Sequence, residues 1–522
     1  MAIEVPTLIG ALSRLEAYAH PVDAVEVHQT HISVVFLAGE FAYKIKKPVN
    51  LGFLDFSTLE KRKHFCDEEV RLNRRLAGDV YIGVIPVTSE RAHLRFGGNG
   101  PAVEWAVQMK RLPADATLEQ RLLRGRVVAE QLRRLAERLA AFHRQAESGP
   151  RISSFGRFEI VAKNARENFT QAAPLVGVTV SPAVFERVRA LTETHLARLH
   201  DLIEQRADAQ VPRDTHGDLH LDHVYLFPDA LPPNDVQMID CIEFSDRFRF
   251  ADPIADMAFL AMDLEFHGRR DLAHAFTDAY VDASGDVAGR GLAPFYSAYR
   301  AIVRAKVEGM ELSEREIDAA EREAAEKRAR AHWLLALGEL AEPSQRPALL
   351  LIAGLPGSGK STLAYSLAPD ANFEVLRSDV VRKELTASHV GENIYTDAWT
   401  ERTYGELLAR AEKLFWQGRR VLIDANFRED ANRLRFLEAA GRWAVPALFV
   451  HCRADPAIIR KRLDARRNDA SDADWRVYQS LQAAWQPLSD EVRRAAFEVN
   501  TSGDVAEGAN SVRARLVSEG LL

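Results

Sequence analysis

The fold of the C-terminal third is decided by Leu349-Leu-Leu-Ile-Ala-Gly-Leu-Pro-Gly-Ser-Gly-Lys-Ser361. Five apolar residues predict a buried strand, and the glycine-rich segment that follows predicts a tight loop. The next residues, from Thr362 to Leu367, have the composition of a helix start. The stretch therefore predicts strand, loop and helix in immediate succession.

The spacing G-x-x-x-x-G-K-S, from Gly354 to Ser361, predicts a site for nucleotide phosphates in this context. Glycines allow backbone N–H groups to turn inward, and the helix N-terminus adds a positive dipole end. We expect Lys360 to reach the β- and γ-phosphates and the Ser361 hydroxyl to bind Mg²⁺. The predicted nucleotide-binding residues are Gly354, Leu355, Pro356, Gly357, Ser358, Gly359, Lys360, Ser361 and Thr362.

Two carboxylates follow neighbouring apolar segments. Val421–Asp424 is a second apolar strand, and its terminal Asp424 is expected to hold Mg²⁺. Asp379 follows a third strand, Phe373–Leu376, at the end where ligands bind in parallel sheets. It is a candidate catalytic base for an attacking hydroxyl. The alternative is an N-cap for a helix over Val380–Leu385.

Arginines gather before a polar loop at residues 468–474. Arg462 and Arg466 stand one helical turn apart, so both can face the same way. They are predicted to act catalytically, as lid residues that approach the transferring phosphate. The alternative is a solvated basic face.

From residue 348 to 522 apolar strands alternate with helices, which predicts an α/β domain with a parallel sheet. This domain resembles the small P-loop kinases related to gluconate kinase, chloramphenicol phosphotransferase and zeta-type toxins. The motif from Gly354 to Ser361 carries the resemblance most strongly.

The N-terminal part has a different pattern. Between residues 25 and 110 we expect short strands, among them Val25–Val27, Ser33–Leu37, Phe41–Lys46 and Val103–Met109, with one helix after the capping signature Ser57-Thr-Leu-Glu60. Residues 117–335 are mainly helical, and a charged helix over Glu314–Leu337 is expected with Ser313 as its N-cap.

A second motif interrupts the helices at Thr215-His-Gly-Asp-Leu-His-Leu-Asp-His223. Two short strands are expected after it, at Val224–Phe227 and Val236–Ile239, and the second leads into Asp240-Cys-Ile-Glu243. A polar loop with an acidic strand end some 20 residues later suits phosphoryl transfer, because one carboxylate can accept the hydroxyl proton while another holds magnesium.

This arrangement resembles the aminoglycoside phosphotransferase and choline kinase branch of the protein-kinase-like fold, over residues 25–335. The resemblance implies that Asp218 is the catalytic aspartate, that Asp240 holds magnesium with possible help from Glu243, and that Lys44 contacts phosphates. It implies Glu69 as the ion-pair partner of Lys44, with Glu68 as the alternative. Asp256, in the second acidic motif, is expected to hold the catalytic loop by hydrogen bonds.

Two features depart from that family. Its metal-binding asparagine, five residues after the aspartate, is replaced by His223, which we keep as a candidate ligand although oxygen suits Mg²⁺ better. The segment Val27–Ile32 has no glycines where protein kinases carry a glycine-rich loop. We expect His216 and His220 to brace the loop, and Lys46 and Lys47 to be solvated.

Composition sets the remaining expectations. The chain has 522 residues, 47% of them hydrophobic, and a formal net charge of −7, which gives no general attraction to nucleic acid. The three cysteines show no metal or disulfide spacing. No signal peptide or membrane span is seen, so a cytoplasmic location is expected. The predicted organisation is a kinase-like domain at 1–338, a linker at 339–347 and a P-loop kinase domain at 348–522.

The sequence therefore predicts an α+β protein-kinase-like domain, with a small β-rich lobe and a helical lobe, joined to an α/β P-loop domain. The expected cofactors are ATP, or GTP in its place, and Mg²⁺. The expected partner is a small polar molecule with a hydroxyl group; membranes and nucleic acid are not expected, and the oligomeric state is left open. The alternatives are a ligand sensor coupled to a nucleotide switch, and a toxin-like or polynucleotide kinase.

Overall fold

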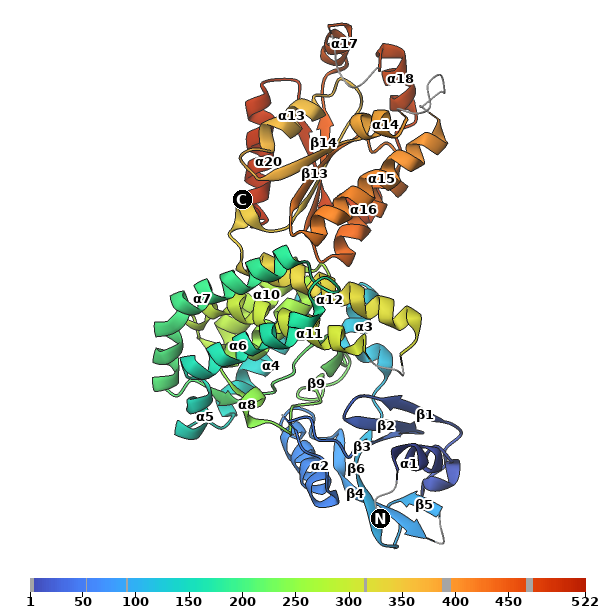
Figure 1. Cartoon of the computed structure of the whole chain (residues 1–522), viewed down its shortest axis with the longest axis vertical. Coiled ribbons are helices and arrows are strands. Elements are labelled where there is room, and N and C mark those ends of the chain that lie inside the picture. The colour runs from blue at the N-terminus through green and yellow to red at the C-terminus, as the bar shows by residue number, and fades with distance from the viewer. Residues whose placement is uncertain (1–3, 53, 91–92, 314–316, 387–395, 466–472) are drawn as a thin grey trace. The chain divides into compact units, whose positions relative to one another are not determined.

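The computed structural model of the chain describes residues 4–52, 54–90, 93–313, 317–386, 396–465 and 473–522 (Figure 1). These residues form two compact units. The first comprises Met1–Ala162, Leu199–Leu264 and Arg270–Tyr296, and the second comprises Lys163–Arg198, Glu265–Arg269 and Ser297–Leu522. No helix in the described part of the chain is both long and apolar enough to cross a membrane.

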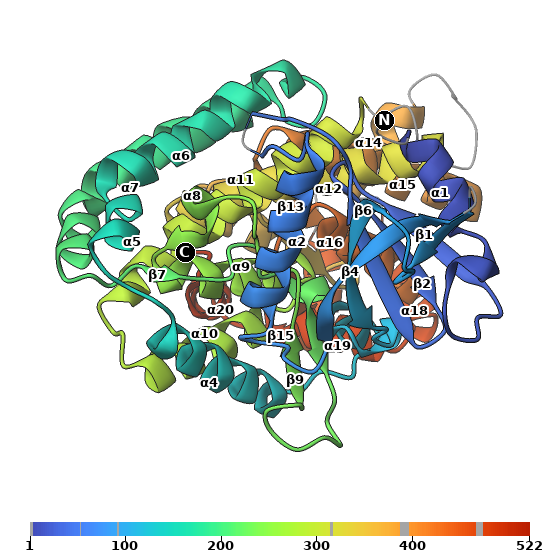
Figure 2. The ribbon, with the colours of Figure 1, turned by 90° about the horizontal axis from the view of Figure 1, so that it is seen from below.

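The first unit contains a six-stranded antiparallel sheet in the order β1-β2-β3-β6-β4-β5. Helix α2 packs on one face of this sheet against β4 and β6 (Figure 2), and α1 covers the other face. The bounds of these elements are β1 Val25–Gln29, β2 Ser33–Ala38, β3 Phe41–Lys46, β4 Tyr81–Glu90, β5 His93–Phe96, β6 Ala102–Lys110, α1 Val5–Leu12 and α2 Leu59–Asn73.

Strand alternation explains the two faces. In β3, Tyr43 and Ile45 join the cluster that contains α1, whereas Ala42 joins the cluster that contains α2. Lys44 and Lys46 have the parity of Ala42, so strand geometry places both lysines on the α2 face. The strands predicted in this region are confirmed, but α1, β4 and β5 were not predicted.

The helical part of the first unit follows the sheet. Its hairpin β8–β9 and short pair β7–β10 position the His-Gly-Asp motif, and α9 is buried on almost all sides, which suits its mainly apolar sequence. The bounds are α3 Leu118–Leu123, α4 Ala129–Gln145, α5 Pro150–Phe155, β7 Arg213–Asp214, β8 Val224–Leu226, β9 Val236–Met238, α8 Asp246–Arg249, β10 Phe250–Ala251, α9 Pro253–Phe266 and α10 Arg270–Ser284.

The second unit contains the predicted parallel sheet, with five strands in the order β12-β13-β11-β14-β15. Helices α13 and α20 cover one face, and α15 and α16 cover the other (Figure 1). The bounds are β11 Leu349–Ala353, α13 Lys360–Leu367, β12 Phe373–Arg377, α14 Ser378–Thr386, α15 Asp397–Trp416, β13 Arg420–Asp424, α16 Asp430–Arg442, β14 Ala447–Arg453, α17 Pro456–Asp464, α18 Trp475–Ala483, α19 Asp490–Ala495, β15 Ala496–Asn500 and α20 Val505–Ser518. Both predicted architectures are confirmed.

The second unit also includes helices that precede the parallel sheet in the chain. They are α6 Phe158–Ala172, α7 Pro182–Asp208, α11 Ala293–Glu311 and α12 Ala319–Leu340, of which α6, α7 and α11 extend partly into the first unit. The N-cap of α12 is Asp318, whose side chain accepts the Glu321 N–H, so the predicted cap at Ser313 is wrong. Glu314 lies outside the described residues.

Residues 339–347 are held by side chains of the same unit. Arg420 donates to the carbonyls of Pro343 and Arg346, and Arg187 of α7 donates to those of Gln345 and Gly418. Arginine donors therefore satisfy backbone groups that a free linker would expose to water. The domain boundaries given above remain a prediction.

Candidate functional site

The glycine-rich loop between β11 and α13 needs its glycines at three positions. Gly354, Gly357 and Gly359 have φ values of +154°, +78° and +86°, a backbone region that side chains with a Cβ rarely adopt. A Cβ at Gly354 would also lie 2.6 Å from Ser358 Oγ and 2.9 Å from the carbonyl oxygen of Cys452. The loop can therefore close tightly over the start of α13, where Lys360 is the first residue.

A cavity of about 450 Å³ opens on this loop. It is bounded by the loop, the start of α13, the end of α17 and the segment after β15. The lining residues are Gly357, Gly359, Lys360, Ser361, Thr362, Leu363, Arg462, Ala465, Thr501, Asp504, Val505 and Gly508. This cavity contains the start of α13, where Lys360 and Ser361 line it. The N–H groups of a first helical turn have no partner within the helix, so such a position suits an anion.

The Asp424 carboxylate lies at the end of β13, the strand beside β11. The strand register places it opposite Ile352, two residues before the loop begins. Asp424 is 3% exposed, its Oδ2 lies 3.3 Å from Arg377 Nε, and its Oδ1 has no hydrogen-bond partner among the described residues. A buried carboxylate oxygen without a donor is the group that a bound cation would satisfy, so this position fits the predicted metal role.

The other predicted residues of this site are placed differently. Asp379 is half-buried in the first turn of α14, which begins at Ser378, so the alternative of an N-cap before Val380 is wrong. Arg462 donates to the carbonyls of Gly357 and Thr501, at 3.4 and 2.7 Å, and thus lies against the phosphate loop. Its catalytic role remains a prediction. Arg466 lies outside the described residues.

In the first unit, two lysines of β3 share one glutamate. Lys44 Nζ lies 3.0 Å from Glu69 and 2.5 Å from Asp240. Lys46 Nζ lies 2.7 Å from Glu69 and also contacts Glu243. Glu69 is therefore the partner of Lys44, as the sequence predicts, whereas the alternative Glu68 pairs with Arg71 instead.

The burial of these groups governs their charges. Burial alone would raise the pKa of Asp240, but the ammonium of Lys44 and the His223 imidazole outweigh it and hold that pKa below its usual range. Glu69 is fully buried, and its pKa is lowered because Lys44 and Lys46 together outweigh desolvation. For Glu243 desolvation wins, and its pKa is raised. Lys46 is 2% exposed, so the expectation that it is solvated is wrong.

Sequence reasoning missed Lys46 although a signal was present. Residues two apart on a strand share a face, so Lys46 had to lie beside Lys44 once β3 was assigned. It also missed Thr501 and Asp504, which line the phosphate-loop cavity after β15. Their position after a parallel strand, where ligands bind in such sheets, was the signal available for them.

The His-Gly-Asp loop is held from below by Asp256, as predicted. The two carboxylate oxygens of Asp256 accept the backbone N–H groups of His216 and Gly217 at 2.7 and 2.9 Å. The His216 ring bonds the carbonyl of Ile239 at 2.8 Å, and burial lowers the pKa of His216 to about 4, so it braces the loop as a neutral ring. Asp218 is left at the loop tip, with its side chain 40% exposed.

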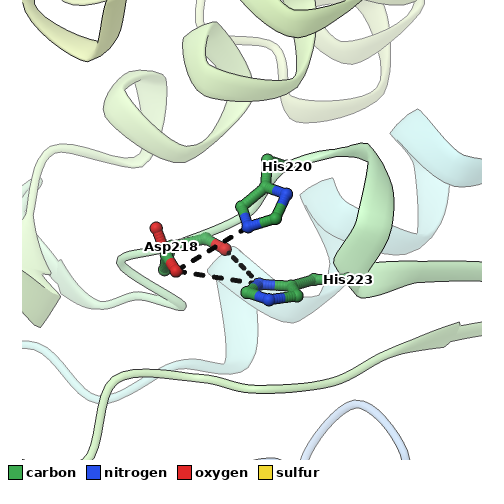
Figure 3. A group of neighbouring side chains, drawn as sticks. All are labelled: Asp218, His220 and His223. Carbon is green, nitrogen blue, oxygen red and sulfur yellow. Dashed lines mark hydrogen bonds and ion pairs between the residues drawn. The ribbon is translucent and has the colours of Figure 1, made fainter. Parts of the chain in front are cut away.

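Two histidines lie beside Asp218 (Figure 3). His220 Nε2 and His223 Nδ1 are 3.9 and 3.8 Å from Asp218 Oδ2, and the two rings are 3.8 Å apart between centroids. One possible ligand atom from each of these three residues lies within 4.8 Å of the other two. Among the described residues, no other set of three His, Cys, Asp or Glu side chains meets this distance. His223 also approaches Asp240, with 3.6 Å between Nε2 and Oδ2. The predicted metal candidates Asp240 and His223 are thus neighbours.

Comparison with known proteins identifies relatives of the chain and of its parts. Residues 349–488 match a family model described as an AAA domain. Among solved structures, a gluconokinase from Sinorhizobium meliloti 1021 is 16% identical and covers 33% of this chain and 93% of its own, with a TM-score of 0.27. Aminoglycoside 2′-phosphotransferase-IIIa, solved with GDP, is 14% identical and covers 60% of this chain and 94% of its own, with a TM-score of 0.37.

Relatives of nearly the whole chain occur in mycobacteria. Rv2004c and MT2060 of Mycobacterium tuberculosis and Mb2027c of Mycobacterium bovis are each 35% identical to it over 481 residues. The alignment covers 90% of this chain and 92% of each relative, and so includes both kinds of domain. The chain therefore belongs to the family of these mycobacterial proteins.

Proposed function

We propose that the protein is an ATP-dependent phosphotransferase with two kinase-type nucleotide sites, which transfers the γ-phosphate to a hydroxyl group of a small polar acceptor. The observation that carries the proposal is the cavity on the phosphate loop, where Lys360 and Ser361 begin a helix. The buried carboxylate of Asp424 ends the strand next to β11, which leads into this loop. This set of groups suits a nucleoside triphosphate with its metal.

At the C-terminal site, the residues divide the work as follows. Lys360 and the loop N–H groups bind the phosphates, while Ser361 and Asp424 would hold Mg²⁺. Magnesium, when bound, neutralises negative charge on the phosphates. Asp379 accepts the proton of the acceptor hydroxyl, and Arg462, with Arg466, supplies positive charge near the transferring group.

At the N-terminal site, Asp218 accepts the hydroxyl proton; its side chain is 40% exposed at the loop tip, and it makes no ion pair with Lys44 or Lys46 among the described residues, unlike Asp240. Lys44 is aimed by Glu69, which is held in turn by Lys46. Lys44 also engages Asp240, so binding of nucleotide phosphates to Lys44 would release that carboxylate for the metal.

Calorimetric titration with a non-hydrolysable ATP analogue and Mg²⁺ tests the two sites. The expected stoichiometry is two per chain. Lys360→Ala should remove only the C-terminal site, and Asp240→Asn should remove only the N-terminal site. Asparagine is the conservative choice because it tolerates the positive φ of 64° found at Asp240.

ADP release tests the reaction itself. The purified chain is assayed against sugars, nucleosides and aminoglycosides, with water as the acceptor in the control. Release that rises above the control with at least one hydroxyl compound, and that Asp218→Asn or Asp379→Asn lowers, supports a phosphotransferase. Absence of acceptor-stimulated release across the library counts against the proposal.

One observation favours a second candidate, a ligand sensor coupled to a nucleotide switch. His223 occupies the position at which the resembling family has an oxygen ligand for magnesium, and Asp240 is already paired with Lys44. A nucleotide stoichiometry of one, eliminated by Lys360→Ala and unaffected by Asp240→Asn, with negligible turnover, would favour the sensor.

A further inference from the structure

The orientation of His223 is fixed by a backbone hydrogen bond. Its Nδ1 lies 2.8 Å from the carbonyl oxygen of Asp218, and a carbonyl can only accept. Nδ1 must therefore carry the proton, which leaves the lone pair of the neutral ring on Nε2. A backbone carbonyl bonded to Nδ1–H is the usual support of a histidine that binds metal through Nε2.

The lone pair on His223 Nε2 faces a carboxylate oxygen of Asp240 rather than a hydrogen-bond donor. Nε2 is 3.6 Å from Asp240 Oδ2, too far for a hydrogen bond. Two atoms at this separation can both lie at the usual 2.0–2.2 Å from a single cation placed between them. The other oxygen of Asp240 is held by Lys44 at 2.5 Å, so Oδ2 is the one available to a metal.

The charge of the surroundings also favours a cation. In the described part of the chain, Glu69, Asp240 and Glu243 form their lysine ion pairs with Lys44 and Lys46, so the group holds three carboxylates and two ammonium groups. Two further groups that could bind a metal lie beside the His223 ring: Asp218 near its Nδ1, and His220, 7% exposed, with its ring centroid 3.8 Å away. The region thus combines a net negative charge with more than one imidazole nitrogen.

We propose that the N-terminal site takes a transition-metal dication of the Zn²⁺, Co²⁺ and Fe²⁺ class in preference to Mg²⁺, with His223 Nε2 and Asp240 as its first protein ligands. The inference rests on the proposed function, in which this site binds a metal nucleotide, and it names the metal class. Imidazole nitrogen suits these ions, whereas Mg²⁺ demands oxygen ligands and keeps its waters.

Cobalt is the probe, because its visible absorption reports directly on its ligands. The full chain without nucleotide is dialysed against Co²⁺, alone and with a large excess of Mg²⁺, and bound metal is measured together with the absorption spectrum. We expect one Co²⁺ per chain, retained against Mg²⁺ and displaced by Zn²⁺. His223→Asn should weaken Co²⁺ binding by ~10–100-fold, and Asp240→Asn should weaken it similarly.

His200→Asn is the matched control, since His200 is half-exposed on α7 and pairs only with its neighbour Asp201 among charged groups of the described residues. It should bind Co²⁺ as the parent does, which would exclude adventitious binding to surface histidines. Thermal unfolding of each variant shows whether it folds. If His223→Asn fails to fold, Asp240→Asn still tests the metal assignment.

The outcomes separate this inference from the proposed function. If two nucleotides bind but Co²⁺ is displaced by Mg²⁺, or if His223→Asn leaves Co²⁺ binding unchanged, the metal assignment is wrong and the phosphotransferase proposal stands. If no dication binds and the nucleotide stoichiometry is one, both the metal assignment and the N-terminal nucleotide site are wrong.

Discussion

Gly418 is the residue whose substitution tests how the P-loop sheet is anchored to the helices of its own unit. It forms the turn between α15 and β13 and has a φ of +68°, and its carbonyl oxygen accepts a hydrogen bond from Arg187 of α7 at 2.9 Å. A Cβ added there would lie 2.7 Å from a methyl carbon of Leu337 in α12 and 3.0 Å from one of Val184 in α7.

The magnitude expected for Gly418→Ala follows from two effects. Alanine in the left-handed region is less favourable by ~1–2 kcal/mol, and this is partly offset by ~0.4–1 kcal/mol because the unfolded chain loses freedom. Forcing a methyl group into a packed contact adds ~1–3 kcal/mol. We therefore expect a net destabilisation of ~1–5 kcal/mol.

Gly177→Ala is the matched control. Gly177 belongs to the same unit and has a φ of +89°, but nothing lies within 4 Å of a Cβ built there. It should show the backbone effect alone, ~1 kcal/mol or less. The difference between the two variants isolates the packing of the turn against α7 and α12.

Hydrogen exchange followed by mass spectrometry is the assay, because it reports the free energy of local opening in α12 and β13 separately. Gly418→Ala should lower protection in both elements. Equal protection in the two glycine variants would refute the packing argument.

Three further predictions concern the two sites. Lys46→Met should destabilise the first unit by ~3–5 kcal/mol in urea unfolding, because it leaves buried carboxylates without their cation. Adding Glu243→Gln should restore part of this loss. An unchanged unfolding midpoint for Lys46→Met would contradict the buried ion pairs. Burial lowers the pKa of His216 to about 4, from an ordinary value near 6.5, so its contribution to stability is present above pH ~6.5 and is lost, by up to ~3 kcal/mol, as pH falls toward 4. The unfolding free energy of His216→Gln should therefore decline less steeply than that of the parent over this pH range. An identical decline in both proteins would contradict the lowered pKa of His216. Lys360→Ala should lower ADP release at the C-terminal site by ~10²–10³-fold, and release at the parental rate would mean that the cavity is not the phosphate site.

The phosphate-loop domain could be predicted from sequence because its signals are local. Strand, loop and helix follow each other between residues 349 and 367, and the glycines with positive φ are those of the motif itself. The unpredicted parts of the fold depend on tertiary contacts. β4 contains Pro86 and Gly83, which argue against a strand, yet it pairs along its length with β6 and packs under α2.

The charges of the N-terminal site were harder to predict for a related reason. Sequence pattern identified Lys44, Glu69 and Asp240 one by one, through resemblance, but the burial of Lys46 depends on Glu243, which lies 197 residues away in the chain. A lysine has no local reason to be buried, and only the two carboxylates brought to it by the fold make burial tolerable.

The two sites therefore differ in how substitutions should affect them. In the proposed C-terminal site, backbone N–H groups and one lysine would bind the phosphates, so Lys360→Ala should remove a ligand contact and leave the strand core of β11 and β13 intact. The N-terminal site uses side chains that also neutralise one another in the interior. Removing Lys44 or Lys46 changes the charge left on Glu69, so function and stability must fall together there. A variant that loses nucleotide binding at the N-terminal site without losing stability should thus come from its exposed or metal-facing groups, which among the described residues include Asp218, His223 and Asp240.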